Sequence, residues 1–214
     1  MNLRALTAEA LGTTLLVATV IGSGIMAERL SAGNVGLALL ANTVATGAVL
    51  YVLITALAPV SGAHFNPVVT LIHGAGRDRS GMMVMQVCGA CAGALLAHLM
   101  FDMPIISERI AARTGAGQWL GEFVATFGLL FIITLGSARR DRSLPAQVAL
   151  WIVAAYWFTS STSFANPAVT IGRALTGSFA GIRWIDVPLF ILAQIAGGFA
   201  GHWCAKFIGS ERQA

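Results

Sequence analysis

Residues Ser163–Arg173 read Ser-Phe-Ala-Asn-Pro-Ala-Val-Thr-Ile-Gly-Arg, and residues Ala63–Leu71 read Ala-His-Phe-Asn-Pro-Val-Val-Thr-Leu. Both stretches contain Asn-Pro, which favours the start of a helix because asparagine is a good N-cap and proline suits the first helical turn. We therefore predict two short helices that begin at Asn66 and Asn166. Each helix start carries unpaired N–H groups and a partial charge of about +0.5, so two such ends in an apolar chain would form a polar site that repels cations.

The composition is that of a membrane protein. Of the 214 residues, 57% are hydrophobic and only 10% are charged, whereas soluble domains carry about 25% charged residues. The net charge of +4 comes from a few loop arginines, so it does not indicate nucleic-acid binding. The sequence contains no recognisable nucleophile with an adjacent base and no metal-ligand cluster, so we expect neither an enzyme nor a bound metal or cofactor.

Six apolar segments are expected to be membrane-spanning helices. They cover approximately residues 5–26, 34–59, 80–101, 118–136, 145–158 and 187–205. A signal peptide is the alternative for 5–26, but that segment is longer than the apolar core of about 7 to 15 residues in signal peptides. The Asn-Pro helices are too short to span. We predict re-entrant half-helices there, which a membrane tolerates only where protein or a water-filled cavity covers the open backbone.

The two halves of the chain repeat one another. Three matched sets of residues carry the repeat: Asn66-Pro-Val-Val-Thr70 and Asn166-Pro-Ala-Val-Thr170, Glu9 and Glu122, and Gln86 and Gln194. We therefore divide the single transmembrane domain, residues 1–214, into repeats at 1–108 and 109–214. Three spans per repeat make the second repeat inverted, so the two Asn-Pro ends can meet near the middle of the membrane. Because a charge is costly at membrane depth, both glutamates should accept hydrogen bonds from the re-entrant loop backbones.

Basic residues set the expected orientation. Five of the 13 lysines and arginines fall on one side of the predicted spans. The other side holds eight: Arg4, Arg77, Arg79, Arg139, Arg140, Arg142, Lys206 and Arg212. By the positive-inside rule, this second side is cytoplasmic and both termini lie there. We therefore expect a multi-pass protein of the cell's inner (plasma) membrane.

Six spans, inverted halves and paired half-helices at Ser61-Gly-Ala-His-Phe-Asn-Pro-Val-Val-Thr70 and Asn166-Pro-Ala-Val-Thr170 resemble the aquaporin and aquaglyceroporin (major intrinsic protein) family. The resemblance covers about the whole chain. It implies an all-α membrane protein with six transmembrane helices and two re-entrant half-helices, assembled in the lipid bilayer as a homotetramer with one pore per subunit. It also implies that the side-chain amides of Asn66 and Asn166 donate hydrogen bonds to a single file of water or solute. The central constriction would comprise Asn66, Pro67, Val68, Asn166, Pro167 and Ala168.

The family has a second constriction, near the outer mouth, where the resemblance locates selectivity. Counted from the two asparagines without gaps, its positions are Thr46, Ala154, Ser163 and Val169. The aromatic, histidine and arginine side chains of a water-selective channel are all missing from these positions. Such a filter is wider and more apolar, so polyols and metalloid hydroxides such as arsenous acid or methylated arsenic species should pass. The missing arginine also resembles bacterial members of the family that are associated with arsenic handling.

Three features leave alternatives open. Arg173 lies one helical turn beyond Val169. Its side chain either reaches the outer vestibule and partly replaces the missing charge, or is held by loop carbonyl groups. His64 either lines the inner vestibule or holds backbone groups of its own loop. Cys88 and Cys91 either bind arsenic through their thiols or pack against neighbouring helices.

Inverted repeats with broken helices occur in passive channels and in secondary transporters. A transporter usually needs a titratable coupling group or an ion site beside its substrate, whereas the central pair here is two neutral amides. We therefore interpret the chain as a passive channel for water, glycerol-like polyols and other small neutral solutes. A secondary transporter and a more water-selective channel are the alternatives.

Overall fold

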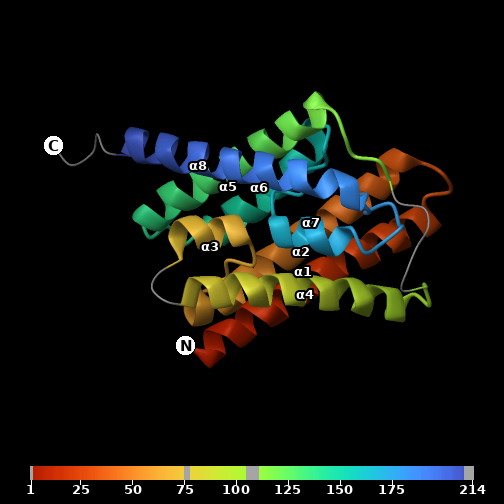
Figure 1. Ribbon diagram of the computed structural model, residues 1–214, viewed down its shortest axis with the longest axis horizontal. Helices are drawn as coiled ribbons and strands as arrows, with labels where there is room; N and C mark the ends of the chain where they lie inside the picture. The colour runs from red at the N-terminus through yellow and green to blue at the C-terminus, as the bar shows by residue number, and fades with distance from the viewer. Residues whose placement is uncertain (1, 75–77, 105–110, 210–214) are drawn as a thin grey trace.

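The computed structural model describes residues 2–74, 78–104 and 111–209, and these residues form an all-helical fold (Figure 1). The helices are α1 (Leu3–Leu30), α2 (Val35–Ser61), α3 (Pro67–His73), α4 (Arg79–Met100), α5 (Ala116–Ala138), α6 (Leu144–Phe158), α7 (Pro167–Arg173) and α8 (Val187–Gly209), with a short 3-10 turn at Trp184–Asp186. Within the described ranges, five of these helices are long and apolar enough to cross a membrane, and α6 is a shorter apolar helix of 15 residues. The predicted class, six transmembrane helices with two half-helices, is confirmed.

Several predictions fall outside the described residues. Arg77, Arg109 and Arg212, which enter the count of basic residues, are among them. So are residues 108 and 109, where we divide the chain into repeats.

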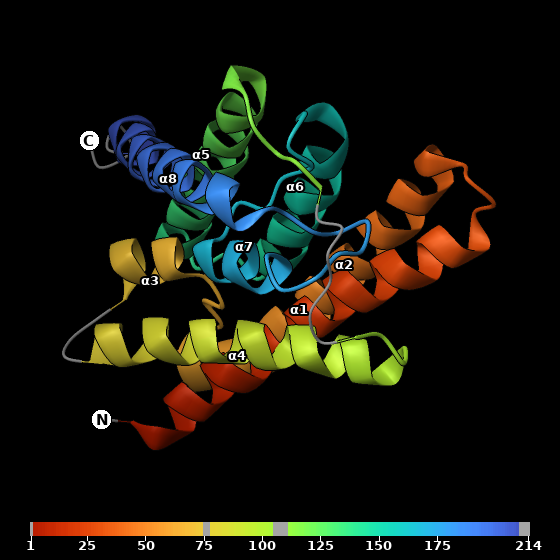
Figure 2. The ribbon, with the colours of Figure 1, turned by 45° about the vertical axis from the view of Figure 1, so that its right-hand side comes forward.

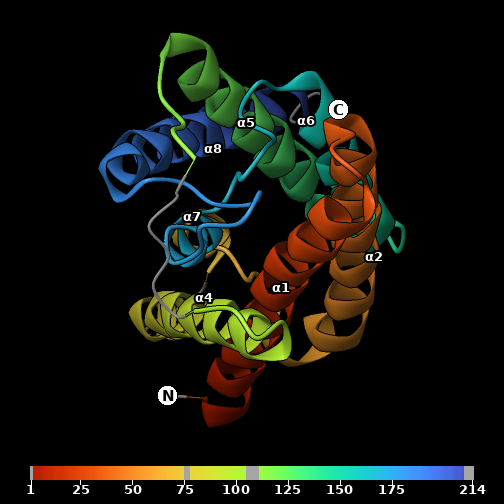
Figure 3. The ribbon, with the colours of Figure 1, turned by 90° about the vertical axis from the view of Figure 1, so that its right-hand side faces the viewer.

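The spanning helices form two sets with the half-helices between them. In the first set α1 packs on α2 and α4, and in the second α5 packs on α6 and α8. The sets join where α2 contacts α6. Figures 2 and 3 show α3 and α7 between the two sets, so protein surrounds the short helices that could not face lipid alone.

Glycines allow the closest helix crossings, and the two sets use them in the same way. A Cβ atom added to Gly89 of α4 would lie 2.4 Å from the carbonyl oxygen of Ala10 in α1. A Cβ atom added to Gly197 of α8 would lie 2.2 Å from the carbonyl oxygen of Phe123 in α5. No other residue type fits at these distances, so the helix backbones meet directly, as small residues allow in membrane bundles.

The chain direction defines two ends of the molecule. The start of α1, the end of α8 and the α5–α6 turn lie at one end, which we call the termini end (Figure 1). The α1–α2 turn and the start of α8 lie at the opposite end (Figure 1). From the centre, α3 extends toward the termini end and α7 toward the opposite end, so the two half-helices begin near each other.

Candidate pore

The two half-helices start at asparagine caps, as predicted. The Asn66 side-chain oxygen accepts a hydrogen bond from the Val68 N–H at 3.0 Å, and the Asn166 oxygen accepts one from the Ala168 N–H at 2.9 Å. In each helix proline occupies the first turn, where its missing N–H costs no hydrogen bond. Each cap uses the amide oxygen, so the amide nitrogen remains available as a donor.

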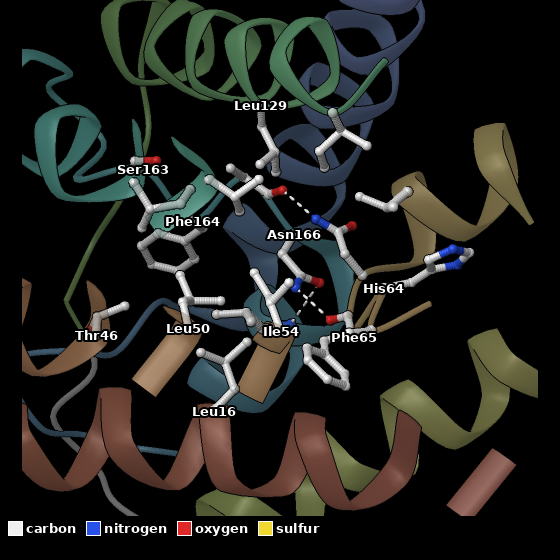
Figure 4. Close-up of a pocket in the computed structure, with 18 of the residues that line it drawn as sticks. Leu16, Thr46, Leu50, Ile54, His64, Phe65, Leu129, Ser163, Phe164 and Asn166 are labelled. Carbon is white, nitrogen blue, oxygen red and sulfur yellow. Dashed lines mark hydrogen bonds between the residues drawn. The ribbon is translucent and has the colours of Figure 1, made fainter. Parts of the chain in front are cut away.

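The amide nitrogens join the two loops. Asn66 Nδ2 donates to the Ala165 carbonyl at 2.8 Å, and Asn166 Nδ2 donates to the Phe65 carbonyl at 2.7 Å (Figure 4). These reciprocal bonds hold the two helix starts against each other. Because an amide nitrogen has two protons, each asparagine keeps one N–H that can be offered to a solute.

Glu9 of α1 supports the first loop. Its carboxylate accepts the backbone N–H groups of His64 at 3.0 Å and Phe65 at 2.7 Å. It also accepts the Ser61 hydroxyl at 2.6 Å and the Gln86 amide at 2.7 Å. With these four donors the fully buried carboxylate is well compensated, so the predicted contact with the loop backbone is confirmed.

Glu122 of α5 supports the second loop in the same manner. It accepts the backbone N–H groups of Phe164 at 2.8 Å and Ala165 at 2.9 Å, and the Gln194 amide at 2.6 Å. Both predicted glutamate contacts are therefore present at equivalent positions. A carboxylate held by backbone donors is a scaffold, and its hydrogen-bond capacity is largely used within the protein.

The loops before both asparagines have a costly backbone conformation. Ala63 and Phe65 have φ angles of 52° and 48°, and Ser163 and Ala165 both have φ of 50°. A positive φ at a residue other than glycine costs of order 1–3 kcal/mol and needs surrounding structure to hold it. The buried glutamates supply that support, and the conformation leaves the Phe65 and Ala165 carbonyls where the asparagines reach them.

A cavity passes the point where the loops meet, and its wall has two different sides. The spanning helices contribute apolar side chains such as Leu16, Leu50 and Leu129 (Figure 4). The re-entrant loops contribute polar groups, including both asparagine side chains. One apolar wall and one row of hydrogen-bonding groups suit a small neutral solute, because such a solute carries no charge that the wall must compensate.

Three of the four predicted filter residues line this cavity. Thr46, Ser163 and Val169 face it, whereas Ala154 lies on the exposed side of α6 and does not line it. Tyr156 lines the cavity instead, with its hydroxyl 3.4 Å from the Thr46 hydroxyl. The predicted position Ala154 is therefore corrected. The ungapped count failed because α6 ends at Phe158 and an irregular segment, rather than a fixed helical register, connects it to the second asparagine.

Arg173 also lines the cavity, and the structure shows one of the two alternatives for it directly. Its Nε donates to the Ala180 carbonyl, so a loop carbonyl does hold it. Its guanidinium carbon lies 3.4 Å from the centre of the Phe164 ring, and its Nη1 has no hydrogen-bond partner among the described residues. The residue is only 2% exposed, so this nitrogen is buried as well as without a partner.

Sequence reasoning missed Arg113, which lies behind the same ring. Its guanidinium carbon is 5.0 Å from the centre of the Phe164 ring, so that ring has two guanidinium neighbours. Arg113 donates to the carbonyl groups of Gly181 at 2.8 Å and Ser161 at 3.1 Å. Burial lowers the pKa of the Arg113 guanidinium, and the charge of Glu122 opposes that shift. A guanidinium stays protonated in proteins, so this region is positively charged.

Imidazoles occupy the other part of the cavity. His64 lines it (Figure 4). Its Nδ1 lies 3.1 Å from the Thr70 hydroxyl, so the hydrogen-bond partner of this nitrogen is a side chain and not a backbone group. His73, which sequence reasoning did not single out, lines it too. The available signal was its position: His73 follows Asn66 by the same interval by which Arg173 follows Asn166.

The cysteines contribute nothing to this cavity. Cys88 and Cys91 of α4 are free thiols, Cys88 is exposed, and neither residue lines the cavity. The packing role considered for Cys88 therefore does not apply within one chain. Within the described ranges, no group of three or more His, Cys, Asp and Glu side chains could hold a metal ion.

Two half-helices that meet through neutral amides inside a bundle of apolar helices define a membrane channel. The family model described as "Major intrinsic protein" matches residues 1–159. The chain therefore belongs to the major intrinsic protein family, whose members are channels and not enzymes. It is a multi-pass membrane protein that lies in a lipid bilayer and conducts small solutes.

Similar proteins agree with this assignment. Aquaglyceroporin AqpS of Rhizobium meliloti is 53% identical over 195 residues, which cover 89% of this chain and 83% of that protein. Probable aquaporin AqpM of Archaeoglobus fulgidus is 28% identical over 242 residues and covers 96% of both chains. A solved structure of the aquaglyceroporin from Plasmodium falciparum matches with a TM-score of 0.70 at 17% identity, covering 97% of this chain and 95% of that one. The structural likeness shows the fold.

Proposed function

We propose that the chain is a passive channel for water, glycerol-like polyols and uncharged metalloid hydroxides such as arsenous acid or methylated arsenicals. The observation that carries the proposal is the wall beside Val169. There the cavity is lined by an apolar side chain and the hydroxyls of Thr46, Tyr156 and Ser163, with Arg173 stacked against Phe164. Hydroxyls can donate and accept, so they can exchange hydrogen bonds with a solute that carries several hydroxyl groups.

In this proposal the filter consists of Thr46, Tyr156, Ser163 and Val169. Ser163 lines the cavity and its buried hydroxyl has no hydrogen-bond partner among the described residues, so in this proposal it pairs with a passing solute. An unpaired buried polar group costs about 1–3 kcal/mol, which a hydrogen-bonding solute relieves. The central constriction is formed by Asn66, Pro67, Val68, Asn166, Pro167 and Ala168, and of these the two asparagines line the cavity.

Positive charge in this proposal excludes cations. Two half-helix starts converge at the centre, and Arg173 adds a guanidinium farther along α7. A helix start carries about half a positive charge, and an apolar surround strengthens its effect on an ion. We assign Arg173 to the outer vestibule and His64 to the inner one, in agreement with the cavity that both residues line.

The name of the similar rhizobial protein, an aquaglyceroporin, supports the polyol class. We propose the metalloid hydroxides because they share the uncharged, hydroxyl-bearing chemistry.

We further propose that the protein lies in the inner (plasma) membrane with cytoplasmic termini, that it forms a homotetramer, and that its inverted repeats cover residues 1–108 and 109–214. The shared end of α1 and α8 supports the placement of the termini, and the matched roles of Glu9 and Glu122 support the repeats.

Stopped-flow measurements on proteoliposomes test the proposal. Water, glycerol and arsenous acid are compared at matched protein content, with no ion gradient. A channel of this kind gives fast downhill flux of all three that does not saturate with solute concentration. Saturable flux that depends on an ion gradient would identify a secondary transporter, and water flux without glycerol flux would identify a water-selective channel.

A further inference from the structure

Two histidines from different helices converge on Thr134, and one of them, His73, lines the cavity. His73 Nε2 lies 3.1 Å from the Thr134 hydroxyl oxygen, and His202 Nδ1 lies 3.0 Å from the same oxygen. His73 belongs to α3, Thr134 to α5 and His202 to α8. The ring centroids are 5.3 Å apart and the rings are nearly perpendicular, at 86°. Two imidazole nitrogens therefore point at one position from two directions.

The Thr134 hydroxyl links the two rings by hydrogen bonds, and the ring separation also fits a shared metal ion. With metal–nitrogen bonds of about 2.0–2.1 Å, two imidazoles on one tetrahedral ion have ring centroids roughly 5 Å apart. The observed separation is 5.3 Å, so only small side-chain rotations are needed. Both rings are half-buried, and His73 lines the cavity, so an ion can reach the pair through water.

We propose that His73 and His202 form a site for a divalent transition-metal ion, with the Thr134 oxygen and water completing its coordination. Occupancy lowers solute flux, because the ion binds to a residue of the cavity wall and joins α3 to α8 beside the path. This binding does not depend on which solute the channel conducts.

The imidazole ligands decide which divalent ion the site prefers, and the neighbouring basic groups oppose weakly bound ions. Lys206 acts electrostatically on both rings, and His64 acts on His73, so an approaching cation meets repulsion if these groups are charged. Mg²⁺ and Ca²⁺ prefer oxygen ligands and gain little from imidazoles. Cu²⁺ has the highest affinity for nitrogen ligands among the divalent ions of the first transition row. We therefore assign the site to Cu²⁺ first and to Zn²⁺ second.

Trp203 provides a direct measure of binding, because its ring centroid lies 5.9 Å from that of His202. The full chain is prepared with Cys88, Cys91 and Cys204 changed to serine, so that thiols bind no metal. Adding Cu²⁺ should quench the emission contributed by Trp203, with one ion bound per chain. His73→Gln and His202→Gln should each raise the Cu²⁺ concentration for half-quenching by about tenfold or more. Glutamine can still form a hydrogen bond to Thr134, so the helix contact is kept.

His98→Gln is the matched control, since His98 lies on α4 and outside the cavity wall. This variant should quench like the cysteine-free parent. Trp203→Phe should lose the quenching but keep the inhibition by Cu²⁺. Glycerol flux is measured with Cu²⁺ on both sides of the vesicle membrane. It should fall with Cu²⁺, recover with EDTA and remain unaffected by Mg²⁺.

Equal quenching in the parent and both histidine variants would overturn the site. Quenching that depends on both histidines, with flux unchanged by Cu²⁺, would overturn the effect on conduction. If the histidine variants fail to fold, the parent decides alone: the proposal is wrong if Cu²⁺ neither quenches nor reversibly inhibits. Because quenching is read without any solute, a failed metal site and a failed channel assignment give different results.

Discussion

The loops at residues 63–74 and 163–174 share one set of stabilising hydrogen bonds but differ in side chains that line the cavity. In both, a glutamate accepts two backbone N–H groups and an asparagine caps a seven-residue helix. In both, a glutamine amide bridges that glutamate and a threonine hydroxyl, through Gln86 and Thr70 in the first and Gln194 and Thr170 in the second. The loops differ at four cavity-lining positions, where Ala63, His64, Phe65 and His73 in the first correspond to Ser163, Phe164, Ala165 and Arg173 in the second.

In the proposed channel, this comparison separates the groups that build the path from the groups that we propose to select the solute. The shared groups stabilise the strained backbone of each loop and bring the two asparagines together. The unshared groups line the cavity on either side of that meeting point, with imidazoles toward one side and a guanidinium stacked on an aromatic ring toward the other. Selection at the two mouths can therefore differ without any change to the centre.

Removing the shared carboxylates should have the largest effect. In Glu9→Gln or Glu122→Gln, one oxygen becomes an NH₂ group that faces backbone donors, so at least one buried N–H loses its acceptor. Each change should destabilise the fold by about 3 kcal/mol, since a buried unpaired donor costs about 1–3 kcal/mol and the bonds to a charged group are lost as well. Thermal unfolding in detergent, followed by circular dichroism, measures this.

Glu28→Gln is the control for these variants. Glu28 accepts the Phe179 N–H at 3.3 Å in an exposed setting, so its loss should change stability little. Loss of stability in only one of Glu9→Gln and Glu122→Gln would contradict the equivalence of the loops.

Asn66→Asp and Asn166→Asp should have the next largest effect, on conduction. Aspartate keeps the oxygen that caps the helix but cannot donate to the opposite loop, and its charge faces two positive helix starts. Solute flux should fall by about tenfold, equivalent to about 1.4 kcal/mol on the barrier, and cation leak should rise. Both are measured in liposomes with matched insertion. Unchanged behaviour of both variants would mean that these ends do not meet in the path.

Val169→Arg tests the proposed filter position on the second half-helix. A guanidinium there occupies volume that a large solute needs and adds donors that a single water can use. The ratio of glycerol to water permeability should fall several-fold, and the ratio for arsenous acid should fall with it. Stopped-flow measurement of both ratios checks this.

If Val169→Arg leaves the permeability ratio unchanged, the double variant with Arg173→Ala distinguishes two explanations. If the ratio falls only when Arg173→Ala is added, Arg173 already limits passage in the unaltered chain. If neither variant changes the ratio, Val169 lies outside the constriction and the filter assignment is wrong.

The sequence predicted those features that depend on neighbouring residues. Asparagine followed by proline is a local signal, so the N-caps of α3 and α7 were predicted to the residue, and each helix begins at the next residue. The segment predicted at residues 5–26 is longer in the structure, as α1 spans Leu3–Leu30, because hydropathy reports the hydrocarbon core and a helix continues beyond it. The glutamate contacts could be predicted because both repeats carry the same residues.

Features that depend on distant segments could not be predicted in the same way. Arg113 lies in a loop without a motif, and its partners Ser161 and Gly181 follow 48 and 68 residues later. The contact of His73 and His202 with Thr134 needs the mutual placement of three helices. The Ala154 error has the same origin, since counting along the chain cannot follow an irregular connection.

Arg173→Gln should give the smallest effect and the sharpest test of the difference between the two mouths. The Arg173 guanidinium stacks on Phe164, and the residue lines the cavity, so its charge acts on a solute there. Glutamine removes that charge while retaining a polar amide on a shorter side chain. Cation leak should rise modestly, because Arg113 remains behind the ring and both helix starts still repel cations.

His73→Gln is the matched control, at the equivalent position of the first loop. A neutral imidazole contributes no fixed charge, so its replacement should raise the leak less than Arg173→Gln does. The measurement is potassium leak from proteoliposomes under an imposed potential, at matched insertion and in the absence of transition metals. An equal rise in both variants would mean that the guanidinium is not what distinguishes the mouths. No rise in Arg173→Gln, with a rise in Asn166→Asp, would place cation exclusion at the centre alone.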